Sequence, residues 1–136
     1  AYPLRIVTDT AQIRKNLEYY IAKVPVKKTP AMSKSVYSVL YARLGKAEQA
    51  LHYFYDSYLP NLNPPFRVIA EFNGGTNPYF ITGAGGTLQA IIFGFAGLEI
   101  TDKGLKQVYT PILPKEWSSL TIRVAGKEIV HVNKNE

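Results

Sequence analysis

The sequence contains no cysteine, which excludes disulfide bonds and thiolate chemistry and leaves the compartment open. It has no apolar run approaching the roughly 20 residues that a membrane-spanning helix needs, and no signal-peptide pattern. We therefore expect no membrane association, and periplasmic, secreted and cytoplasmic locations all stay open. The chain begins Ala-Tyr-Pro-Leu-Arg without an initiator methionine, so we expect a fragment or a processed product.

Acidic residues are fewer than basic ones, ten against sixteen, which gives a formal net charge of +6. Such an excess can attract polyanions, but the basic residues are dispersed, with Arg14-Lys15 and Lys27-Lys28 the only adjacent pairs. We expect an ordinary basic surface and no nucleic-acid partner. At 136 residues, 46% hydrophobic and 19% charged, the chain has the size and composition of one globular domain.

Three amphipathic helices are predicted in the first half of the chain. Asp9, with Gln12 three residues later, resembles a capping box at the start of the first helix. The second is predicted over 31–44, with Gly45 as its left-handed C-terminal cap, and the third over 46–58. The residues expected to be buried are Ile13, Leu17, Tyr20, Ile21 and Val24 in the first, Met32, Val36, Val39, Leu40 and Leu44 in the second, and Ala47, Ala50, Leu51, Phe54 and Tyr58 in the third.

The stretch 66–100 organises the rest of the chain. It starts with an apolar run that carries Glu71, then passes through a loop over 73–78 that is rich in Gly, Asn and Pro. We expect residues 83–86 to be an irregular lead-in to a short buried helix over 88–95. A cluster of glycines beside an acidic residue suggests that the backbone turns sharply or approaches a ligand closely.

The other segments are predicted to be extended. Prolines at 60, 64 and 65 should keep residues 59–65 extended. Helices first and strands afterwards indicate an α+β fold, or the junction of two domains near residue 97. The expected hairpins pair 98–100 with 105–108 through a turn at 101–104, and 120–124 with 128–132 through a turn at 125–127.

Glu71 is the leading candidate for chemistry. Its neighbours Ile69, Ala70 and Phe72 can partly desolvate the carboxylate, an environment that suits a general base. The ordinary alternative is a glutamate on the polar face of a strand, paired with Arg67 four residues earlier. Spacing alone favours that alternative.

The run Thr-Gly-Ala-Gly-Gly at 82–86 can present backbone N–H groups to an anion at a helix start. It lacks the Lys-Ser/Thr ending of a P-loop, and Leu88 stands where the G-x-G-x-x-G pattern needs its last glycine. Close packing of a helix against its neighbour explains the glycines equally well.

The remaining candidates are weaker. Aromatic side chains can stack on a sugar, but scattered aromatics are more often core residues. The two histidines have no accompanying ligand cluster, so we expect no metal site, and we expect no cofactor. The side chains in question are Phe72, Tyr79, Phe80, Trp117, His52 and His131.

The sequence contains two longer motifs, Pro-Pro-Phe-Arg-Val-Ile-Ala-Glu at 64–71 and Tyr-Phe-Ile-Thr-Gly-Ala-Gly-Gly-Thr-Leu-Gln-Ala-Ile-Ile-Phe-Gly-Phe-Ala-Gly-Leu at 79–98. Together they resemble the C-terminal end of family 65 glycoside hydrolases. The similarity extends over nearly the whole chain. It implies a fold in which residues 1–96 are the last helices and active-site loop of an (α/α)6 barrel, and residues 97–136 a small β domain.

The resemblance also implies a mechanism. The hydrolase branch is similar to inverting glycosidases, in which one carboxylic acid protonates the leaving oxygen while a carboxylate activates water. Glu71 would be that general base, and Thr82, Gly85 and Gly86 would line the pocket near the water. The family's general acid lies upstream of this segment, so we expect the isolated chain to be inactive without the remainder of the catalytic domain.

The expected substrate is a small α-glucoside of the trehalose or kojibiose type. In the family's phosphorylase branch phosphate replaces the water, and a histidine near the glycine-rich loop holds the anion. This chain has no histidine between residues 53 and 130, which favours hydrolysis. A phosphorylase of the same family and a non-catalytic carbohydrate-binding or structural module stay open as alternatives.

Overall fold

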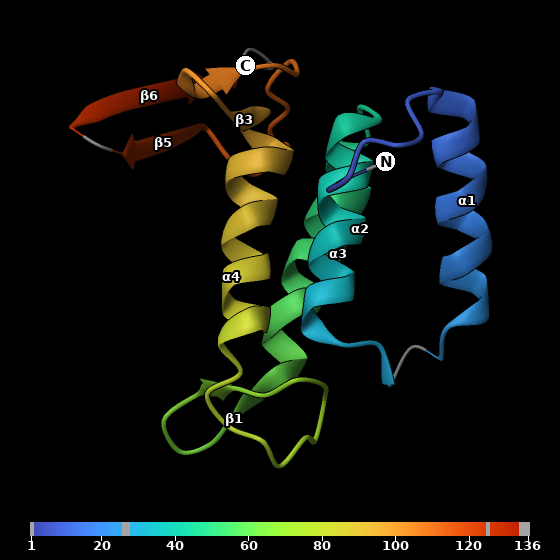
Figure 1. The fold of residues 1–136 in the computed structure, drawn as a ribbon. Coiled ribbons are helices and arrows are strands. Elements are labelled where there is room, and N and C mark those ends of the chain that lie inside the picture. The colour runs from blue at the N-terminus through green and yellow to red at the C-terminus, as the bar shows by residue number, and fades with distance from the viewer. Residues whose placement is uncertain (1, 26–27, 125, 134–136) are drawn as a thin grey trace.

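The structure is a computed structural model that describes residues 2–25, 28–124 and 126–133. Helices precede most of the strands (Figure 1), which agrees with the predicted α+β class. No helix in the described part of the chain is long and apolar enough to cross a bilayer. The elements are α1 (Thr10–Lys23), α2 (Ala31–Arg43), α3 (Ala47–Tyr58), the 3-10 turn η2 (Leu59–Asn61), β1 (Leu62–Asn63), β2 (Val68–Ile69), α4 (Ile81–Gln89), the π-helix η3 (Ala90–Phe95), β3 (Leu98–Thr101), β4 (Gly104–Gln107), β5 (Ser119–Val124) and β6 (Lys127–Val132).

Helix α1 begins at the predicted cap. The Asp9 carboxylate accepts a hydrogen bond from the Gln12 amide at 2.7 Å, but the Gln12 side chain donates to Asn16, so only half of the capping box forms. The predicted apolar face is wrong in extent, because Leu17 is the one residue of α1 that is buried. Figure 1 shows the reason: α1 stands to one side of the other three helices.

The buried face of α2 differs from the predicted one. Val39 is buried as predicted, but Met32 is 44% exposed, and the other buried residues are small or polar: Ala31, Lys34, Ser35, Ser38 and Ala42. Helix α2 packs against both α3 and α4, and two close neighbours favour small side chains over long apolar ones. The prediction for α3 is confirmed in Ala50, Leu51 and Phe54. Gly45 has φ +74°, as its predicted role as a left-handed cap requires.

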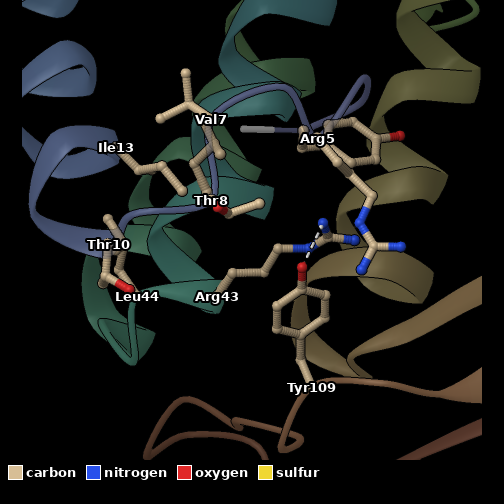
Figure 2. Close-up of a pocket in the computed structure, with 10 residues that line it drawn as sticks. Arg5, Val7, Thr8, Thr10, Ile13, Arg43, Leu44 and Tyr109 are labelled. Atoms are coloured by element: carbon tan, nitrogen blue, oxygen red, sulfur yellow. Dashed lines mark hydrogen bonds between the residues drawn. The ribbon is translucent and has the colours of Figure 1, made fainter.

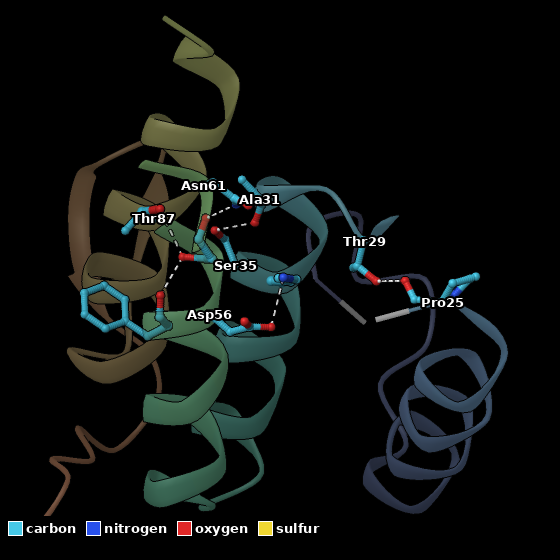
Figure 3. Close-up of polar contacts among 10 residues, drawn as sticks. Pro25, Thr29, Ala31, Ser35, Asp56, Asn61 and Thr87 are labelled. Carbon is cyan, nitrogen blue, oxygen red and sulfur yellow. Dashed lines mark hydrogen bonds and ion pairs between the residues drawn. The ribbon is translucent and has the colours of Figure 1, made fainter. Parts of the chain in front are cut away.

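Polar side chains between the helices form hydrogen bonds and ion pairs (Figure 3). Ser38 Oγ donates to the Ala50 carbonyl at 2.8 Å. Lys34 Nζ lies 3.0 Å from the Asp56 carboxylate, which Figure 3 shows. Ser57 Oγ donates to a carbonyl of its own helix and lies 3.1 Å from Thr87 Oγ1 on α4. These pairs explain how hydroxyl and ammonium groups can be buried beside a small apolar core.

The glycine-rich run lies inside α4, so the expected irregular lead-in at residues 83–86 is wrong. Three glycines of α4 and η3 face α2, where side chains would collide. A Cβ on Gly83 would lie 2.9 Å from Ala31 Cβ, one on Gly86 3.1 Å from Ser35 Oγ, and one on Gly94 3.2 Å from Val39 Cα. Glycine is a poor helix former, but here it permits the close approach of the two helices. The packing interpretation of the run is therefore confirmed.

The strands form three antiparallel hairpins in the described residues: β1–β2, β3–β4 and β5–β6. The last two were predicted, with Thr101 opposite Gly104 and Ile122 buried on the inner face of β5. Ala125 of the predicted second turn lies outside the described residues. Residues 59–65 are not uniformly extended, because the 3-10 turn η2 precedes β1.

One aromatic group joins the last hairpin to the helices. The Phe95 ring lies 4.7 Å from the Trp117 ring and 5.8 Å from the Phe54 ring, measured between centroids. Trp117 is therefore packed against the core rather than free to stack on a sugar. Whether residues 1–96 and 97–136 form separate domains stays a prediction.

Arg43, the last residue of α2, connects the helices to β3 through Glu99, and Figure 2 shows it beside Tyr109. Its Nη2 lies 3.1 Å from Glu99 Oε1 and its Nε donates to the Phe93 carbonyl at 3.2 Å. The guanidinium also lies over the Tyr109 ring, 4.2 Å from the centroid. Arg5 pairs with the other Glu99 oxygen at 2.7 Å, so Glu99 is buried between two arginines.

The packing of α4 on α2 can be tested with alanine. Gly83→Ala should lower the free energy of unfolding by about 1–3 kcal/mol, because the new methyl group would lie 2.9 Å from both Ala31 Cβ on α2 and Phe80 Cδ1. Gly85→Ala is the matched control: its Cβ would meet nothing within 4 Å, so stability should be unchanged or rise by up to about 1 kcal/mol. Urea unfolding measures both, and equal effects of the two substitutions would contradict this packing.

The connection at Arg43 can be tested against an exposed ion pair. Arg43→Ala should lower the free energy of unfolding by about 3 kcal/mol, because Glu99 loses its buried partner. Arg123 and Glu128 form a pair with 76% and 48% exposed side chains, so Arg123→Ala should change stability by less than about 1 kcal/mol. If thermal or urea unfolding shows a larger loss of stability for Arg123→Ala than for Arg43→Ala, the Arg43–Glu99 pair does not contribute more than the exposed pair.

Candidate functional site

Glu71 lies just past β2, at the start of the loop 70–80. Backbone hydrogen bonds fix this end of the loop from three sides. The Ala70 amide donates to the Asn61 carbonyl at 2.8 Å, and the Phe80 amide donates to the Ile69 carbonyl at 2.9 Å. The amide of Ala31, the first residue of α2, donates to the Glu71 carbonyl at 2.8 Å. The backbone that carries the carboxylate is therefore attached to the start of α2.

The Glu71 side chain is held by an amide and not by a cation. Asn77 Nδ2 donates to Glu71 Oε2 at 3.1 Å, and the Glu71 amide donates to Asn77 Oδ1 at 3.4 Å. Among the ion pairs of the described residues, Glu71 takes part in none. The exposed Arg67 is thus not its salt-bridge partner, and this alternative from the sequence is not what the structure has. The carboxylate is half-buried, and its contact is with a neutral group.

The Gly74-Gly75 pair lets the loop turn back toward Glu71. Gly74 has φ +75°, a left-handed conformation that favours glycine. Gly75 is buried, and a Cβ there would lie 3.0 Å from the Phe72 carbonyl oxygen and 3.1 Å from Asn77 Oδ1. Asn63 Nδ2 on β1 donates to the Gly75 carbonyl at 2.8 Å. The backbone angle of Gly74 and the close contacts of Gly75 therefore explain structurally why glycines stand near Glu71.

The other predicted site residues lie on α4. Thr82 is exposed in the first turn of the helix, and Gly85 is half-buried on a side where nothing lies within 4 Å of an added Cβ. Gly86 is buried against Ser35 of α2. Inside an α-helix, amides at the positions of Gly85 and Gly86 donate to carbonyl oxygens one turn earlier. Their contact with a ligand stays a prediction, as does that of the exposed Thr82 hydroxyl.

The two histidines have different surroundings, and neither belongs to a metal cluster. His52 is exposed on α3 and contacts the Tyr53 ring. Burial lowers the pKa of His131 on β6 below the usual value, so the neutral ring is favoured. Within the described residues no group of three or more His, Cys, Asp or Glu could hold a metal ion.

The aromatic residues of the loop lie near the surface. Tyr79 is 76% exposed and has φ +62°, which is unusual for a residue with a side chain. Phe72 is 38% exposed, and Phe80 is half-buried against Gly83. Stacking of these rings on a sugar stays a prediction.

A pocket of about 120 Å³ lies at the far end of α2 from Glu71 (Figure 2). Its charged side chains, Arg5 and Arg43, are both paired with Glu99, and burial raises the pKa of the Tyr2 phenol, which Arg43 partly offsets. No sequence pattern pointed to this group, because the partners come from distant segments. Because both arginines are paired with Glu99, we interpret this group as a structural connection.

Asn77 is the site residue that the sequence analysis missed. A signal was present, because an asparagine six residues after Glu71 follows a Gly-Gly pair that can reverse the chain. Recognising the contact required the path of the whole loop.

No protein-family profile matches the chain. The kojibiose hydrolase of Flavobacterium johnsoniae is 57% identical over 129 residues, and that of Mucilaginibacter mallensis 54% over 128; each match covers 94% of this chain. An α,α-trehalose phosphorylase of Geobacillus stearothermophilus is 31% identical over 124 residues, which cover 89% of this chain and 15% of that protein. The chain spans 19% of the length of each kojibiose hydrolase, about a fifth. On these similarities, together with the motifs around Glu71 and along α4, the chain belongs to glycoside hydrolase family 65 and corresponds to part of such a protein.

Proposed function

We propose that this chain is the C-terminal part of a hydrolase that cleaves a small α-glucoside with inversion, and that Glu71 is its general base. The observation that carries the proposal is the attachment of Glu71: its carboxylate is oriented by Asn77 and no cation neutralises it among the described residues. The identity of more than half to two kojibiose hydrolases supports a kojibiose- or trehalose-type disaccharide as substrate.

In this proposal α1–α4 are the last helices of an (α/α)6 barrel, and the strands beyond residue 97 belong to an appended β domain. Exposed apolar side chains on the helices support the assignment. Tyr19 and Tyr20 on α1 are 59% and 61% exposed, and Ile81 and Leu88 on α4 are 82% and 60% exposed. Apolar surface of this kind usually marks an interface. The remainder of the catalytic domain would cover it and supply the general acid.

The reaction needs two carboxyl groups on opposite faces of the sugar ring, about 6.5–9.5 Å apart. The acid, outside this segment, protonates the glycosidic oxygen as its bond to the anomeric carbon breaks. Glu71 takes a proton from water, and the water oxygen bonds to the anomeric carbon from the opposite face. Thr82 would bind the water or a sugar hydroxyl. No phosphate or metal takes part.

Glu71→Gln tests the general base in the full-length protein. The amide has nearly the same shape but cannot accept the proton, so turnover of kojibiose or trehalose should fall by about 10²- to 10⁴-fold while disaccharide binding persists. Glucose release gives the rate and calorimetry gives the affinity. Glu18→Gln, the same change on the exposed surface of α1, is the matched control. Turnover near the wild-type level in Glu71→Gln would rule out the assignment.

A second candidate function is phosphorolysis, which the similarity to a trehalose phosphorylase favours. Phosphate would then attack the anomeric carbon in place of water, and no general base would be needed. We expect glucose to be released at the same rate without inorganic phosphate and with roughly 50 mM of it, a concentration far above a typical KM of up to about 1 mM. Formation of glucose 1-phosphate would identify the phosphorylase and exclude the hydrolase.

A further inference from the structure

We propose that Asn77 is the positioning residue for Glu71, orienting one carboxylate oxygen so that the other is left to accept the proton from water. The inference rests on the proposed function and adds a residue to it. Asn77 contacts Glu71 twice, through the side-chain oxygen Oε2 and through the backbone amide. A single asparagine thus fixes both the backbone and the side chain of the same glutamate.

The hydrogen bonds divide the two carboxylate oxygens. Oε2 accepts from Asn77 Nδ2 at 3.1 Å, whereas the described residues offer Oε1 no hydrogen bond. A general base needs this asymmetry, since one oxygen must be fixed and the other must reach the water. No charged side chain of the described residues forms an ion pair with Glu71, so the orienting contact comes from the neutral amide of Asn77.

The loop backbone is fixed on both sides of Asn77. Asn63 Nδ2 donates to the Gly75 carbonyl at 2.8 Å, and β2 accepts the Phe80 amide at the end of the loop. Gly75 leaves room for the Asn77 side chain, because a Cβ there would lie 3.1 Å from Asn77 Oδ1. Asn77 itself is exposed, and both hydrogen bonds of its side chain go to Glu71.

Asn77→Asp separates the two contacts in the full-length protein. The new carboxylate would keep one oxygen that can accept from the Glu71 amide, but its second oxygen would face Glu71 Oε2 where the N–H had been. Two facing carboxylates resist simultaneous ionisation. The acidic limb of the pH–rate profile should therefore move up by about one pH unit, and kcat at neutral pH should fall about 10- to 100-fold. KM should change less than about twofold, because Asn77 holds the base and not the sugar.

Two further variants complete the experiment. Asn73→Ala alters an exposed asparagine of the same loop, for which the structure shows no hydrogen bond, and should leave kcat and the pH profile unchanged. Asn77→Ala removes both contacts and should lower kcat at least as far as Asn77→Asp. Thermal unfolding of each variant shows whether the protein is folded; if Asn77→Asp is not, Asn77→Ala takes its place and its kcat-against-KM split is decisive.

A folded Asn77→Asp enzyme with wild-type kcat and pH profile overturns the proposal. A loss of kcat with an unmoved acidic limb also overturns it, because a merely structural residue would give that result. The Glu71→Gln variant distinguishes the two proposals. If Glu71→Gln is inactive and Asn77→Asp is normal, only the role of Asn77 fails; if Glu71→Gln is active, the general base fails as well.

Discussion

The close contact of α4 with α2 is the constraint on which the rest of the structure depends. Ala31 takes part in both halves of it: its Cβ would lie 2.9 Å from a Cβ on Gly83, and its amide donates to the carbonyl of Glu71. A larger residue at either position would separate the helices and displace the loop that lies across their ends. The packing of the two helices therefore sets the position of the loop and, with it, the position of the Glu71 carboxylate.

The glycines of this chain have two different roles that look alike in the sequence. Gly83, Gly86 and Gly94 are helical and make room for α2, whereas Gly74 and Gly75 turn the loop. The helical glycines and Gly75 are required because a side chain would meet another backbone or side chain, whereas Gly74 is required for its positive φ. The small buried residues of α2 have the same origin, because close helices leave no space for long side chains. The hydroxyl groups among them donate to helix carbonyls and so remain satisfied.

Features that depend on neighbouring residues could be predicted from the sequence. The Asp9 cap, the Gly45 turn, the apolar face of α3 and the two C-terminal hairpins all follow from local patterns, and the structure has them. The buried face of α2 and the helical state of residues 83–86 could not be predicted, because contacts with another helix override intrinsic preference. Glu71 could be singled out by its apolar neighbours. Its partner could not, since Arg67 is nearer in sequence and Asn77 is nearer in space.

Helix α2 has the Glu71 attachment at its first residue and the buried Arg43–Glu99 pair at its last. With 13 residues, the helix is about 20 Å long, and it is stiff on that scale. A tilt of α2 about the ion pair would therefore displace its first residue and, through the hydrogen bond from the Ala31 amide, the residue that carries the carboxylate. Displacements near 1 Å at a reacting group can change rates about a hundredfold. Substitutions in the C-terminal hairpins would in this way change the rate of a reaction at the other end of the helix.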